Sequence, residues 1–193
     1  MTVLLVGEMP PQTWERREDY RRGHSPMFTY PPRSSGHRLY VTSDLMLGEY
    51  IHGLTRINLV PEYRAKWPKR EEAEALAKAA MARFSIGAPV NHPIPPFSTG
   101  APVSHAFLCG RRVVDAFRPF FPSGYKPWPV DEIGRAPGTI FYCIPHPSGR
   151  SLAYNDEDVR LRVRTMFQEV QPLLADWPKR TSHNERRLVR DGH

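Results

Sequence analysis

The stretch of residues 141–151 constrains the fold more than any other part of the chain. Residues 141–144 form an apolar and aromatic run that predicts a buried strand, and Pro145 ends it because proline has no N–H to donate to a ladder. A turn with His146 follows, and Asn155-Asp156 then offers a cap for a helix. The apolar residues of that helix recur at spacings of four and three: Val159, Val163, Met166, Val170 and Leu173. The stretch therefore predicts the order strand, turn, helix.

The rest of the chain repeats this alternation. Strands are expected at 2–6, 56–60, 103–109 and 139–144, and helices at 41–51, 71–84 and around 113–117, before the helix described above. The intervening segments 12–38, 88–97 and 120–138 are expected to be loops. The order predicts an α/β fold, a three-layer α/β/α sandwich with a central, mostly parallel four-stranded sheet. We expect one domain over residues 1–176 and a basic tail over residues 177–193.

Three polar residues accompany the predicted strands. Glu8 comes directly after the first strand, Asn58 lies in the apolar second one, and His146 follows the fourth. Each has a plain structural explanation: Glu8 caps a turn, Asn58 braces a neighbouring loop, and His146 sits in a solvated connection. Ligands of open α/β sheets bind at the carboxyl ends of the strands, and histidine is suited to proton transfer near neutral pH. A shared site at one edge of the sheet explains all three residues together.

The charge of the chain favours a polyanionic partner. Lysine and arginine total 27 against 20 acidic residues, which gives a net charge of +7. In residues 12–38, arginines alternate with aromatic rings, a pattern that suits phosphates on the cations and bases on the rings. The alternative is a solvated charged loop packed over a few rings.

The two cysteines, Cys109 and Cys143, each end an apolar run. We expect buried free thiols of a reducing compartment, rather than a disulfide, and the spacing matches no metal site. The N-terminal apolar run is too short for a signal peptide or a membrane span. These features predict a soluble cytoplasmic protein.

Five short motifs follow one another in a familiar order. They are Gly7-Glu8-Met9-Pro10, Ser35-Gly36 with Leu39, Ile57-Asn58-Leu59-Val60, Leu108-Cys109-Gly110-Arg111, and His146-Pro147-Ser148 followed by Gly149-Arg150-Ser151. Between Val3 and about Val170 the chain resembles the uracil-DNA glycosylase superfamily. The similarity is closest to the branch whose first motif is Gly-Glu-Ala-Pro-Gly.

The resemblance implies cleavage of the N-glycosidic bond of uracil, or a related modified base, flipped out of DNA. His146 would donate a hydrogen bond to a base carbonyl, Asn58 would recognise the edge of the base, and Glu8 or Glu15 would hold the attacking water. The base would meet Gly7 and Met9 and stack on Tyr30, with Phe28 as the second candidate. The residues expected to contact DNA are Arg33, Ser148, Gly149, Arg150 and Ser151, with Arg150 filling the gap left by the base. We expect a monomer that needs no cofactor or metal.

The chain departs from the family pattern in three places. It has two cysteines, so it cannot hold the iron–sulfur cluster of this branch with four cysteine ligands. Met9 replaces the water-positioning aspartate or asparagine of other branches, and Pro11 replaces a glycine. These departures leave open a catalytically silent module of the same fold that binds a modified base or nucleotide. An enzyme acting on a free nucleotide is a third alternative, and it would lack salt-dependent DNA affinity.

Overall fold

A five-stranded sheet lies at the centre of the fold, with the strand order β2-β1-β3-β5-β4. The computed structural model describes residues 2–10, 27, 29, 33–85, 102–121, 123–124, 131–136, 138–148 and 151–174. Four strands run parallel: β1 (Thr2–Gly7), β2 (Leu54–Asn58), β3 (Val103–Cys109) and β5 (Thr139–Ile144). The fifth strand, β4 (Asp131–Ala136), lies antiparallel to β5 at one edge.

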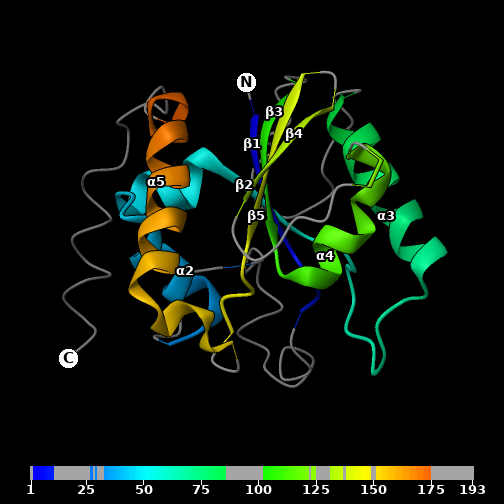
Figure 1. The fold of residues 1–193 in the computed structure, drawn as a ribbon, viewed down its shortest axis with the longest axis horizontal. Helices are drawn as coiled ribbons and strands as arrows, with labels where there is room; N and C mark the ends of the chain where they lie inside the picture. Colours follow the sequence, from blue (N-terminus) through cyan, green and yellow to red (C-terminus); the bar gives the residue numbers. More distant parts are fainter. Residues whose placement is uncertain are drawn as a thin grey trace.

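Helices cover both faces of this sheet, which Figure 1 shows nearly edge-on. On one face lie α2 (Ser35–Ser43) and α5 (Glu157–Leu174), and on the other α3 (Arg70–Ser85) and α4 (Arg111–Ala116). Three short helical segments complete the described elements: the π-helix η2 (Glu49–Gly53) and the 3₁₀ helices η3 (Arg118–Phe120) and η4 (Leu152–Asn155). The three-layer α/β/α architecture predicted from the sequence is confirmed.

Strand β1 shows why the sheet is buried on both sides. Its side chains alternate, so Leu4 and Val6 pack toward α3 and α4 while Val3 and Leu5 pack toward α2 and α5. All four are almost completely buried. A strand between two helical layers therefore carries a continuous apolar run, as parallel strands generally do.

Most predicted elements are present, with shifted boundaries. Strand β2 starts two residues earlier than expected, so Asn58 ends the strand instead of lying inside it. Helix α2 starts at Ser35, within the segment 12–38 that we expected to be a loop, because the Ser34 side chain accepts a hydrogen bond from the His37 N–H and caps the helix. The helical prediction over residues 41–51 was wrong in its middle, since the chain leaves α2 at Asp44 with a positive φ of 59°.

Strand β4 is the largest error, since we assigned residues 120–138 to a loop. In α5 the expected face is nearly right: Val163 and Val170 are buried, whereas Leu173 is 36% exposed and the neighbouring Leu174 is buried instead. The predicted cap is present at Asp156, whose carboxylate accepts a hydrogen bond from the Asp158 N–H at 2.9 Å.

The structure also bears on the simpler predictions. Cys109 and Cys143 are buried free thiols, as expected. In the described part of the chain no helix is long and apolar enough to cross a membrane, and no cluster of metal-ligating side chains is found there. The predicted basic tail, residues 177–193, lies outside the described residues.

Candidate active site

The carboxyl ends of the parallel strands bring the three polar residues to one edge of the sheet, the lower edge in Figure 1. Glu8 directly follows β1, Asn58 is the last residue of β2, and His146 lies two residues beyond β5. The strand register pairs Gly7 with Asn58 and Cys109 with Ile144, so these ends are level. The three residues thus share one rim, as their position after the strands predicts.

Gly7 leaves room for Asn58 at the end of β1. A Cβ at residue 7 would lie 2.8 Å from Asn58 Oδ1 and 2.9 Å from the terminal methyl of Met27, closer than such contacts allow. The Asn58 amide therefore lies over the backbone of Gly7, with Met27 beside it. Among the described residues, no group hydrogen-bonds to this amide.

Gly110 has the same role between β3 and α4. Its φ is +95°, and a Cβ there would lie 3.0 Å from His146 Cβ and 3.2 Å from Glu8 Oε1. Its N–H donates to the Ile144 carbonyl at 2.8 Å, which ties the start of α4 to the end of β5. Only a residue without a side chain allows Glu8 and His146 to approach each other over this turn.

The hydrogen bonds of His146 define its tautomer. The Ser148 N–H donates to His146 Nδ1 at 3.1 Å, so in the neutral ring the proton is on Nε2. Burial lowers the pKa of His146; the nearby Glu8 carboxylate opposes this shift and the Arg112 guanidinium adds to it. A neutral imidazole with its proton on Nε2 is the form favoured at neutral pH.

The Glu8 carboxylate forms an ion pair with Arg112 of helix α4. Arg112 Nη1 lies 3.5 Å from Glu8 Oε2, and the Glu8 side chain is only 20% exposed. The backbone around Glu8 is also fixed, because its carbonyl accepts a hydrogen bond from the Val60 N–H at 2.9 Å. The alternative of a turn-capping role finds no support here, since the carboxylate pairs with Arg112.

The turn that carries His146 is braced from both neighbouring elements. Arg38 Nη1, on α2, donates to the carbonyls of Ser148 at 3.0 Å and Ser151 at 3.3 Å. The Tyr154 hydroxyl donates to the Pro145 carbonyl at 3.0 Å. These bonds fix the backbone on both sides of His146, which is therefore not in a freely solvated connection.

Other predicted site residues are placed less centrally or not at all. Met9 is partly buried next to Glu8, and Ser148 and Ser151 are partly buried in the braced turn. Arg33 is exposed and has a positive φ of 69°, just before α2. The remaining predicted residues lie outside the described part of the chain: Glu15, Phe28, Tyr30, Gly149 and Arg150.

Sequence reasoning missed three residues of this site: Met27, Arg38 and Arg112. Arg112 could have been identified from the sequence. It lies in the first turn of the helix that follows β3, and such a residue lies at the same edge of the sheet as the strand ends. Arg38 and Met27 act over separations of 110 and 20 residues, and nothing in the local sequence indicates their contacts.

No protein-family model matches the chain, and no significant match is found among curated proteins.

Proposed function

We propose that the protein is a DNA glycosylase-like hydrolase that cleaves the N-glycosidic bond of uracil or a related modified base in DNA. One observation carries the proposal: Glu8 and His146 both lie over Gly110, at the sheet edge where Asn58 ends β2. The order of motifs that resembles the uracil-DNA glycosylase superfamily supports the same function.

His146 would stabilise the departing base. As the glycosidic bond breaks, the sugar gains oxocarbenium character and the base leaves as an anion. A neutral His146, with its Nδ1 occupied by the Ser148 N–H, can direct Nε2–H at a base carbonyl oxygen. One preorganised donor of this kind contributes about 2.7–4 kcal/mol to transition-state stabilisation.

Asn58 and Glu8 would divide recognition and hydrolysis. An amide with one donor and one acceptor can pair with the N3–H and a carbonyl of uracil, and it rejects a base whose pattern is reversed. Glu8 would position water or stabilise the sugar cation, with Arg112 holding the carboxylate in place.

The braced turn would face the DNA. Ser148 and Ser151 would contact backbone phosphates, and Arg150 would fill the gap left by the flipped base. Leu152, whose side chain is 74% exposed next to this turn, is a second side chain able to enter that gap. Extrusion of a base costs a few kcal/mol, so such contacts are needed for the reaction.

The test is release of free uracil, and of an abasic site, from a uracil-containing oligonucleotide. We expect release by the wild-type protein and a loss of about a hundredfold or more for His146→Ala, consistent with removal of one such donor. Absence of abasic sites on every deaminated or modified base tested would refute the catalytic proposal.

A silent base-binding module is the second candidate, and the Glu8–Arg112 pair favours it. The Glu8 carboxylate is already paired with a cation, and Met9 offers no polar group in place of the water-positioning residue. Calorimetry distinguishes the two candidates, because the module binds a base or oligonucleotide without releasing product.

A further inference from the structure

A hollow outside the Glu8–His146 site lies between the start of α3 and the helices α4 and η3. Its volume is about 300 Å³, and its wall includes Trp67, Arg70, Arg112, Asp115 and Arg118. We call it the Trp67 hollow. Its floor includes Ala73 and Ala116, both almost completely buried, so the base of the hollow is apolar and its rim is cationic.

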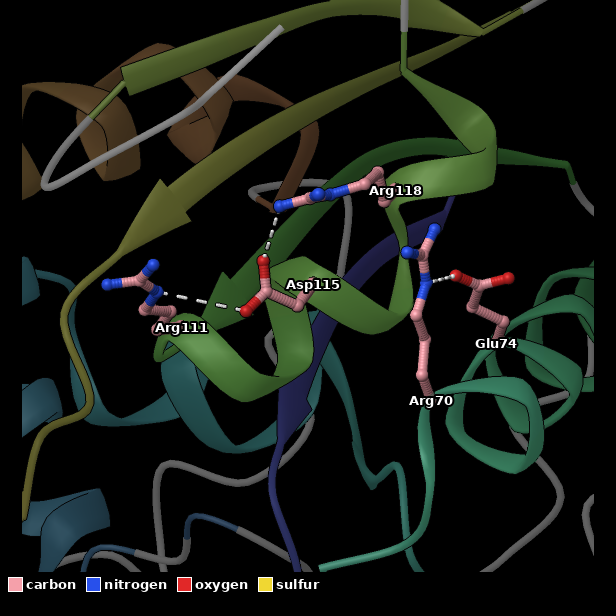
Figure 2. Close-up of polar contacts among 5 residues, drawn as sticks. All are labelled: Arg70, Glu74, Arg111, Asp115 and Arg118. Carbon is pink, nitrogen blue, oxygen red and sulfur yellow. Dashed lines mark hydrogen bonds and ion pairs between the residues drawn. The ribbon is translucent and has the colours of Figure 1, made fainter. Parts of the chain in front are cut away.

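Three arginines and one carboxylate, that of Asp115, line this hollow. Asp115 forms ion pairs with Arg118 at 2.9 Å and with Arg111 at 3.8 Å (Figure 2). Arg70 forms an ion pair with Glu74 at 2.6 Å. Arg112 pairs with Glu8. Each of the three lining guanidinium groups therefore has one carboxylate partner, and each guanidinium has five N–H donors. The lining arginines therefore retain N–H donors for an anion.

Trp67 adds an aromatic surface to this cluster. The guanidinium carbon of Arg112 lies 5.8 Å from the centre of the Trp67 ring, and Trp67 packs against the apolar core. The arginines remain accessible, since the side chains of Arg70 and Arg112 are 73% and 60% exposed. An apolar floor with an aromatic wall suits a nucleobase or sugar, and a forked cationic rim suits a phosphate.

We propose that the Trp67 hollow binds a nucleoside phosphate, either one unit of a DNA strand or a free nucleotide. Arg70 and Arg118 hold the phosphate while the nucleoside lies against Trp67. Arg112 connects the hollow to the candidate active site, because the same side chain contacts Trp67 and Glu8. The proposal does not depend on base excision, since it concerns binding at a different set of residues.

The test follows the indole N–H signal of Trp67 by NMR, assigned with Trp67→Phe, during titration with thymidine 5′-monophosphate and with a short oligothymidylate. We expect both probes to shift this signal, and thymidine alone to bind more weakly. Tighter binding of the oligonucleotide would identify a DNA strand as the ligand, whereas equal binding would identify a free nucleotide.

A matched pair of double variants separates the site from general charge effects. Arg70→Gln with Arg118→Gln should weaken nucleotide binding about tenfold or more, since two charged donors are lost. Lys78→Gln with Arg164→Gln removes the same charge from exposed positions elsewhere and should change binding by less than about twofold. Equal losses in the two double variants, or no shift of the Trp67 signal with either probe, would overturn the proposal.

The variant His146→Ala distinguishes the proposal of base excision from the proposal of nucleotide binding at the Trp67 hollow. It should slow uracil release about a hundredfold or more and leave the Trp67 shifts unchanged. A protein that binds nucleotide at Trp67 without releasing uracil refutes excision alone, and the reverse result refutes the hollow alone.

Discussion

At the scale of single residues, the candidate site depends on glycines that make room and on backbone groups that orient side chains. Gly7 and Gly110 allow polar groups to lie directly over strand ends. The Ser148 N–H leaves His146 with one proton, on the nitrogen that can face a ligand. Both effects are local and make distinct predictions.

Gly110→Ala should destabilise the fold and remove uracil release. A non-glycine residue at this positive φ costs about 1–3 kcal/mol, and the new Cβ would also displace Glu8 and His146. Gly138→Ala is the matched control, because its φ is +87° and nothing lies within 4 Å of the added Cβ. Thermal unfolding and uracil release are measured on both; equal uracil release by the two variants would contradict the assigned role of Gly110.

His146 should make stability depend on pH. Its pKa in the folded protein is lowered by burial, so below about pH 6.5 the unfolded chain takes up a proton that the folded chain does not. The stability that depends on a neutral His146 is fully present above about pH 6.5. It is lost as the pH falls below that value and through the lowered pKa of the folded protein. Urea unfolding of wild type and His146→Gln at several pH values measures the effect. Wild type should lose more stability on acidification; an identical pH profile for the variant would contradict it.

At the scale of elements, the turn after β5 is held by helix α2 and not by its own sequence. Arg38 makes two hydrogen bonds to this turn across more than a hundred residues. The strand–turn–helix order around His146 was predictable from apolar patterning and the proline, because those signals are local. The hydrogen bonds from Arg38 to the turn could not be predicted, because they depend on how α2 packs against the sheet.

Arg38→Ala should loosen the turn. Hydrogen bonds from a charged donor contribute about 1.5–3 kcal/mol, so we expect a loss of that order in stability, faster amide exchange at Ser148 and Ser151, and slower uracil release. Arg38→Lys should restore part of each effect. Arg164→Ala, which removes an exposed ion pair with Asp44, is the control. Unchanged exchange at Ser148 in Arg38→Ala would show that Arg38 does not position the turn.

Elements with weak local signals were predicted poorly. The strand β4 lies at the sheet edge and pairs with β5 with an irregularity between Ile133 and Arg135, and its sequence contains a glycine and three charged residues. Edge strands often have such compositions, so their pairing is decided by the neighbouring strand. Buried strands such as β1 and β5 have stronger patterns and were located almost to the residue.

At the scale of the whole molecule, the parallel sheet is what converts sequence order into a site. Glu8, Asn58 and His146 are far apart in the chain, yet each follows or ends a parallel strand, so all three reach one rim. This convergence could be predicted from the sequence. The pairing of Glu8 with Arg112 and the presence of the Trp67 hollow could not be predicted from the sequence, because both depend on how α3 and α4 pack.

The most direct measurement of the central claim is a double-mutant cycle on single-turnover uracil release, with wild type, Glu8→Gln, His146→Ala and the double variant. If the two side chains act on the same glycosidic bond, each single change slows release and the double variant is faster than the product of the two effects predicts. Independent, multiplying effects, or a wild-type protein that releases no uracil, would contradict the account.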